Sequence, residues 1–158
     1  MAQTINLDTS QRVDITCRKG DTFDLSLTLK DNSATPASIV ANNDTFKMEV
    51  RTTDDGGSPY SSSGDSNAEI ILSTLDNDSD SKHISVKDSA GTTLTSTDAK
   101  QAPTDGIVRF FVTAANMASA PAGLYVYDIE MTDNSSVPSN KVTTLIYGTF
   151  KINEDVSV

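Results

Sequence analysis

The sequence contains few of the residues on which most enzymatic and metal chemistry depends. Its 158 residues include one cysteine, one histidine and no tryptophan. The single Cys17 cannot form an internal disulfide, and it is predicted to be a small buried hydrophobe on a strand. His83 lies in a polar stretch, and no serine stands in a nucleophile-elbow context, so a Ser-His-Asp arrangement is not predicted. We therefore expect no enzymatic activity and no cofactor.

Positive charge is also scarce. The chain has 12 Lys and Arg residues against 22 Asp and Glu residues, which gives a formal net charge of −10. Binding to nucleic acid relies on clustered basic side chains that neutralise phosphates, and the basic residues of this chain are scattered. The composition therefore argues against a nucleic-acid or anionic-membrane partner, and the acidic surface limits unwanted association.

Long apolar runs are missing as well. No segment approaches the roughly 20 apolar residues of a membrane-spanning helix, and the N-terminus has neither the basic region nor the apolar core of an export signal. At this length we predict one domain. Residues 1–12 are expected to be an N-terminal arm or a short strand. Residues 13–158 are expected to form a single β-sandwich with loop insertions around 52–67 and 76–105.

The pattern that dominates the chain is the two-residue alternation of β-strands. The cleanest example is 23–30, in which every second residue is apolar. The other predicted strands are 13–18, 46–51, 68–75, 83–87, 92–97 and 107–113, and one helical turn is predicted at 113–119. Because Phe110 and Phe111 point to opposite sides, strand 107–113 is predicted to be buried on both faces. Together with the C-terminal pair described next, these runs predict an all-β, antiparallel β-sandwich of about 8–10 strands with long polar loops.

The C-terminal third organises this prediction. Two long strand-like runs, Gly123–Thr132 and Val142–Ile152, flank a connection rich in turn-forming residues, so we expect an antiparallel hairpin. Each run has one apolar face. The predicted core residues of the first run are Tyr125, Tyr127, Ile129 and Met131, and those of the second are Thr144, Ile146, Phe150 and Ile152, with Gly148 among them.

Two loop motifs resemble ligand sites only in part. The alternating carboxylates of Asp76–Asp80 would suit Ca²⁺, but Ser81 stands at the turn-glycine position of an EF-hand and Lys87 at its bidentate glutamate. A solvated acidic loop is therefore the favoured interpretation, with Ca²⁺ binding left open. The glycine-rich stretch 55–57 has no strand and helix around it and no phosphate-binding lysine.

Aromatic residues offer little for a sugar-binding platform. Tyr125 and Tyr127 share their strand face with apolar residues, which predicts a place in the core. Tyr60, in a predicted mobile loop, is the best candidate for an exposed aromatic side chain.

Several segments together carry a family resemblance. They are Ile15–Asp31 with its entry Lys19-Gly-Asp-Thr-Phe23, then Phe46–Arg51, Gly106–Phe110, Gly123–Met131, Thr144–Ile152 and Glu154–Val156. They resemble the small immunoglobulin-like domains of tailed-bacteriophage virion proteins, and in particular the N-terminal domains of baseplate upper proteins and similar fibre-attachment domains. In those domains a K-G-D-T-F entry precedes the first long strand. A G-x-Y-x-Y-D strand then pairs with a closing T-L-x-x-G-x-F-x-V strand, whose last position here is Ile152.

The resemblance covers about half of the chain. The chain departs from the family pattern at 52–105, a segment that is longer and more polar than in those domains. It implies an immunoglobulin-like fold, a place in the virion and no catalytic residue. We expect a non-enzymatic phage virion structural protein, a tail, baseplate or fibre-attachment component that docks on other virion proteins and is multimeric in the particle. The main alternative is a head decoration protein bound to the major capsid protein. The second alternative is a host-surface or carbohydrate-binding module.

Overall fold

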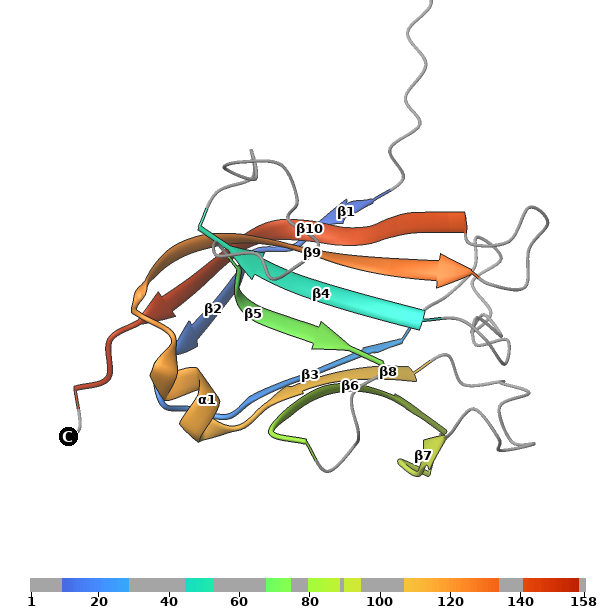
Figure 1. Ribbon diagram of the computed structural model, residues 1–158, viewed down its shortest axis with the longest axis horizontal. Coiled ribbons are helices and arrows are strands. Elements are labelled where there is room, and N and C mark those ends of the chain that lie inside the picture. The colour runs from blue at the N-terminus through green and yellow to red at the C-terminus, as the bar shows by residue number, and fades with distance from the viewer. Residues whose placement is uncertain are drawn as a thin grey trace, which may run out of the picture.

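The computed structural model describes residues 10–28, 45–52, 68–74, 80–88, 90–94, 107–133 and 141–156. In these ranges the chain forms ten strands and one short helix, arranged as two facing sheets (Figure 1). The elements are β1 (Gln11–Arg12), β2 (Ile15–Arg18), β3 (Phe23–Thr28), β4 (Thr45–Arg51), β5 (Ala68–Ser73), β6 (Lys82–Lys87), β7 (Thr93–Leu94), β8 (Ile107–Val112), α1 (Ala114–Ser119), β9 (Gly123–Asp133) and β10 (Lys141–Asn153). The predicted all-β sandwich is confirmed.

The two sheets differ in their strand directions. Sheet A has the order β1-β10-β9-β4-β5, and β2 also pairs with β10. Strands β1 and β2 run parallel to β10, whereas the other neighbours in sheet A are antiparallel. Sheet B has the order β3-β8-β6-β7 and is antiparallel throughout. Sheet A is therefore mixed, because the first strands of the chain lie against its last strand.

This strand order is the one expected of an immunoglobulin-like sandwich. The neighbours β4, β9 and β10 match its C, F and G strands, and β3, β8 and β6 match its B, E and D strands. Helix α1 connects β8 to β9, and its N-cap is Thr113, as the predicted helical turn requires. Beyond the helix, the Tyr125 hydroxyl donates to the Pro121 carbonyl at 2.6 Å. This is the position and the bond of the tyrosine corner of such folds.

The core lies between the sheets and is built from alternate residues of the strands. Phe150 is at its centre, with its ring 5.4 Å from Phe23 and 6.0 Å from Tyr127, both in edge-to-face geometry. Each fully buried large side chain of this kind contributes about 1.5–3 kcal/mol. The largest fully buried side chains are Phe46, Phe110, Phe150, Met48, Leu72, Met117, Ile129, Ile152, Val50, Val108 and Val112.

The predicted C-terminal hairpin is confirmed as β9 paired with β10, and Tyr125, Tyr127 and Ile129 are buried as expected. The prediction for Thr144 is wrong. The pairing shifts between Thr144 and Ile146, which places Thr144 opposite Glu130 on the outer face. This β-bulge lets the adjacent Leu145 and Ile146 both pack against the core, which strict alternation does not allow.

Two other strand predictions need correction. The predicted strand 13–18 is interrupted at Val13 and Asp14, so that β1 and β2 contact β10 separately. The strand predicted at 107–113 is fully buried on one face only, since Phe111 on its other face is half-buried. The chain turns tightly at Gly20 and at Gly91, and both glycines have φ of +82°, a conformation that favours glycine.

The predicted loop insertions fall mostly outside the described residues. Only Thr52 of the first insertion is described. Within the second, the structure describes 80–88 and 90–94, which contain β6 and β7. Of the predicted N-terminal arm or short strand, the described part contains β1.

Candidate functional site

Large apolar side chains are exposed on the outer face of the C-terminal hairpin. Leu124 is 66% exposed, Val142 56% and Tyr147 42%. The register of β9 and β10 places all three on the side of sheet A that faces away from the core. We call this surface the β9–β10 face, and it consists of Leu124, Val126, Asp128, Glu130 and Thr132 on β9 with Val142, Thr144, Tyr147, Thr149 and Lys151 on β10. Leu124, Val126 and Tyr147 lie at neighbouring positions of the register, and grouped apolar side chains of this kind are typical of contact surfaces, whereas Val142 lies towards the other end of the hairpin.

A paired glutamate lies at the β4 border of this face. Glu49 is buried, and its carboxylate forms ion pairs with both Lys47 and Arg51 on the same strand. The Arg51 Nε also donates to Glu49 Oε2 at 2.8 Å. Two cations therefore compensate the one buried carboxylate of β4.

Asp128 lies beside this cluster without a counter-ion of its own. Its cross-strand neighbours are Glu49 on β4 and Tyr147 on β10, and Glu130 follows on the same face. Partial burial raises the pKa of Asp128, and the charges of Glu130 and Glu49 raise it further, while the two cations on β4 act in the opposite direction. Among the described residues, neither Asp128 nor Glu130 forms a side-chain hydrogen bond or ion pair.

The outer face of sheet B is different, because its charged and aromatic side chains pair with one another. Arg109 donates to both carboxylate oxygens of Asp24 at 2.7 Å, which holds the pKa of Asp24 below its usual range. The same guanidinium lies 4.7 Å from the centre of the Phe111 ring. On the neighbouring strand β6, the His83 ring stacks on Phe111 with 5.2 Å between the ring centres. The Nδ1 atom of His83 is 2.9 Å from the Asp80 carbonyl oxygen.

One buried polar group on the outer face of sheet B is unsatisfied. The Ser85 hydroxyl has no hydrogen-bond partner in the described part of the chain. Beside it on β6, Lys87 forms a hydrogen bond with Thr93 of β7. The outer face of sheet B therefore has one hydroxyl without a described partner, whereas its large side chains contact one another.

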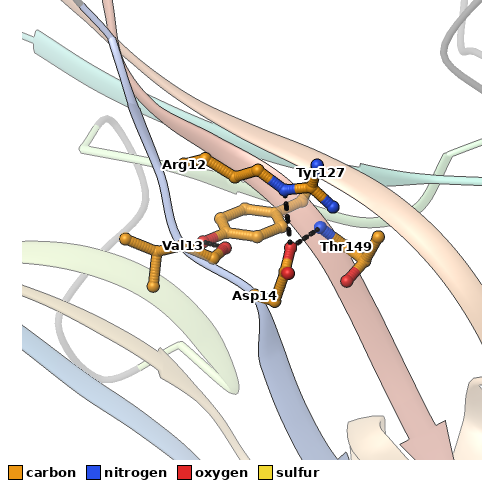
Figure 2. A network of polar contacts seen from close by, with 5 residues as sticks. All are labelled: Arg12, Val13, Asp14, Tyr127 and Thr149. Carbon is orange, nitrogen blue, oxygen red and sulfur yellow. Dashed lines mark hydrogen bonds and ion pairs between the residues drawn. The ribbon is translucent and has the colours of Figure 1, made fainter.

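The interruption between β1 and β2 fastens the first strands to β10 (Figure 2). The Val13 amide donates to the Tyr147 carbonyl at 2.9 Å, and the Tyr127 hydroxyl donates to the Val13 carbonyl at 2.6 Å. Asp14 accepts a hydrogen bond from the Thr149 amide at 3.0 Å and one from Arg12 at 3.3 Å. Except for the bond between Arg12 and Asp14, these bonds join residues more than a hundred positions apart, so they hold β1 and β2 against β10.

Gly148 is what allows this approach. A Cβ at this position would overlap the Val13 carbonyl, so only glycine leaves room for the strand. Burial raises the pKa of Tyr127 to about 12, and the nearby charge of Asp14 adds to the effect. The hydrogen bonds from Thr149 lower the pKa of Asp14. At neutral pH Asp14 is therefore an ionised acceptor and Tyr127 a protonated donor.

The residues that the sequence singled out do not gather into one site. Cys17 lies on strand β2 as predicted but is only half-buried, and this burial raises the pKa of its thiol to about 11. His83 is buried, although it was expected in a polar stretch, because Phe111 covers it. Tyr125 and Tyr127 belong to the core, as predicted. Tyr60, the stretch 55–57 and all of Asp76–Asp80 except Asp80 lie outside the described residues.

Asp128 and Glu130 are the residues that sequence reasoning missed. The sequence shows Asp128 only as the last residue of the G-x-Y-x-Y-D motif, and it indicates no role for Glu130. Two carboxylates on one face of a long hairpin strand, beside exposed apolar residues, are a signal that the alternation itself contains. The alternation does not show, however, that Lys47 and Arg51 on β4 form ion pairs with Glu49.

Other kinds of site receive little support in the described ranges. No three His, Cys, Asp or Glu side chains there are grouped so as to hold a metal ion, and no helix there is long and apolar enough to cross a membrane. A cavity of about 130 Å³ lies against α1, which is smaller than the roughly 300 Å³ of typical ligand pockets. Its lining residues are Ile70, Lys82, Val112, Asn116, Ser119 and Ala120.

No protein-family model matches this sequence, and no curated protein is significantly similar to it. Function is therefore inferred from the residues and surfaces of the chain itself.

Proposed function

We propose that this protein is a non-enzymatic structural component of a tailed-phage virion that attaches to other virion proteins through its β9–β10 face. The observation that carries the proposal is the exposure of Leu124, Val142 and Tyr147 on one side of a long, regular hairpin. An interface needs an apolar centre on a surface that does not rearrange, and a hairpin within a sheet provides one.

Two further features support this proposal. The motif resemblance to phage immunoglobulin-like domains is carried partly by this same hairpin, through Gly123, Tyr125, Tyr127, Asp128, Gly148 and Phe150. In the structure Tyr125, Tyr127 and Phe150 belong to the core and Gly148 makes room for β1, so these four support the hairpin, whereas Asp128 lies on the β9–β10 face. A protein with this organisation works by surface complementarity, with its core residues holding the docking residues in place.

Within the particle we favour a tail, baseplate or fibre-attachment position. The alternative of a carbohydrate-binding module gains nothing from Tyr125 and Tyr127, which are buried as predicted, and its best candidate, Tyr60, lies outside the described residues. A head decoration protein would use the same kind of face, and only its position in the particle would differ.

The test is to locate the chain in particles of the source phage. Purified virions are analysed by quantitative mass spectrometry and by cryo-electron microscopy, beside particles from which the gene has been deleted. We expect a fixed copy number and density at the tail, baseplate or fibre attachment that disappears on deletion. Density on the capsid lattice would assign the decoration role instead. Absence of the chain from purified particles would contradict the proposal.

A further inference from the structure

The charges of the β9–β10 face indicate what kind of partner it fits. Asp128 lies in the middle of the face, with Tyr147 on one side and Glu49 on the other, and Val126 and Glu130 precede and follow it on β9. An apolar stretch and an unpaired carboxylate therefore adjoin one another. Neighbouring strands of a sheet are about 4.8 Å apart, so one bound segment would contact both the apolar stretch and the carboxylate.

The carboxylates outnumber the cations at this point. Glu49, Asp128 and Glu130 face outward from adjacent strands, and the cations among them are Lys47 and Arg51. Both cations already bind Glu49. Asp128 is half-buried and has no ion-pair partner in the described part of the chain, although removing a carboxylate from water is costly unless a donor or a counter-ion compensates it. A bound lysine or arginine would supply that compensation.

A second copy of this chain would not supply it. A two-fold dimer built on this face would set two copies of the same patch against each other, and an axis near Asp128 would bring the Asp128 and Glu130 carboxylates of one copy close to those of the other. Like charges set against each other at an interface cost several kcal/mol. The overall charge of −10 adds to this repulsion.

We propose that the β9–β10 face receives a segment of a different protein that places a lysine or arginine against Asp128 and Glu130 and apolar side chains against Leu124, Val126 and Tyr147. This inference rests on the docking role proposed above and adds the chemistry of the partner. The basic side chain would form a charge-assisted hydrogen bond that is partly shielded from water, and the apolar contacts would provide the buried area.

The experiment maps this contact inside the assembled particle. A photo-cross-linking amino acid replaces Leu124, and in a matched control it replaces Ser26, which is exposed on the outer face of sheet B. Particles carrying either variant are irradiated, and cross-linked peptides are identified by mass spectrometry. We expect position 124 to cross-link to one peptide of another virion protein with a lysine or arginine within a few residues. Position 26 should not cross-link to that peptide.

A charge variant tests the electrostatic part. In competition with the wild-type chain, Asp128→Asn combined with Glu130→Gln should enter particles about tenfold less efficiently, the equivalent of one lost charged contact. The control Asp21→Asn with Glu154→Gln removes the same charge from exposed positions elsewhere and should enter normally. The melting temperature of each purified variant shows whether it folds, and we expect no decrease for the variant on the face.

The outcomes separate the two proposals. If the chain is absent from particles, the proposed function fails and this inference fails with it. The inference alone is overturned in two cases, in which the chain is in the particle and the docking role stands: a peptide of another virion protein at position 124 without a basic residue, and normal entry of the charge variant. A cross-link to a second copy of this chain would overturn both the inference and the docking of this face on other virion proteins.

Discussion

The two outer faces of the sandwich come from strands with the same alternation, yet their side chains are paired very differently. On sheet B, Asp24, Arg109, Phe111 and His83 form a continuous set of contacts, each supported by the next. On the β9–β10 half of sheet A, apolar side chains project into solvent and Asp128 has no ion pair among the described residues.

The difference shows what exposure means on each face. A charged residue that is paired within the chain contributes to stability, and its replacement should lower the free energy of unfolding. An exposed apolar residue or an unpaired carboxylate contributes little or is unfavourable, and its replacement should affect association instead. The predictions below examine this distinction, starting with the support that the β9–β10 face depends on.

The largest loss of stability is expected from Gly148→Ala, which should displace β1 or β10 and so disturb the β9–β10 face. The added Cβ overlaps the Val13 carbonyl, so β1 must leave or β10 must shift, at a cost of about 3 kcal/mol. Urea unfolding measures this cost. Gly123→Ala, whose Cβ would make ordinary contacts, should change the free energy of unfolding by less than about 0.5 kcal/mol. Equal effects of the two substitutions would contradict the role of Gly148.

The next effect separates the two faces directly. Arg109→Ala removes a two-bond ion pair and a contact with the Phe111 ring, so it should lower stability by about 1–2 kcal/mol at pH 7. The matched substitution Leu124→Thr should stay within about 0.5 kcal/mol of wild type. Because the folded-state pKa of Asp24 is lowered, its share is present above its unfolded pKa and is lost as pH falls through the folded value. If Leu124→Thr were the more damaging, the distinction between the faces would be wrong.

A smaller effect concerns the fastening of β1 under the β9–β10 face. Tyr127→Phe removes the hydrogen bond to the Val13 carbonyl and should cost about 1 kcal/mol at neutral pH. The pKa of Tyr127 is raised to about 12 in the fold, from about 10 in an unfolded chain. The wild type should therefore lose this contribution between pH 10 and 12, and the phenylalanine variant should not. Parallel alkaline profiles of stability for the two proteins would argue against the bond.

The smallest effect has the opposite sign. Asp128→Asn should raise stability by a few tenths of a kcal/mol at pH 7, because the ionised carboxylate is partly buried near Glu130 and Glu49. The folded-state pKa of Asp128 is raised, so its favourable contribution is complete below the unfolded pKa and is lost as pH rises through the folded value. The gain of the variant should consequently vanish in acid. A loss of stability at pH 7 would mean that Asp128 is paired in solution.

Much of the fold follows from local patterns in the sequence. The alternation of 23–28, the turn at Gly20 and the cap at Thr113 each depend on residues close together in the chain, and each is found in the structure. The hairpin of β9 and β10 was predictable for the same reason, since its two runs differ from the polar connection between them.

The features that could not be predicted depend on contacts between distant residues. The break at Val13 and Asp14 requires Gly148 and Thr149, which are about 135 positions away. Thr144 changes face because a bulge admits both Leu145 and Ile146 to the core, and two adjacent apolar residues in a strand were the available signal. The candidate face was missed because its unpaired carboxylates are recognised only once the partners of Lys47 and Arg51 are known.

The most direct test of the docking role compares the accessibility of the two faces before and after assembly. Single cysteines replace Leu124, Val142 or Ser26 in a chain that also carries Cys17→Ser, and their rates of maleimide labelling are measured in the free protein and in purified particles. We predict that labelling at positions 124 and 142 slows at least about tenfold in the particle, whereas labelling at position 26 changes little. Unchanged labelling at 124 and 142, with protection at 26 instead, would contradict the account.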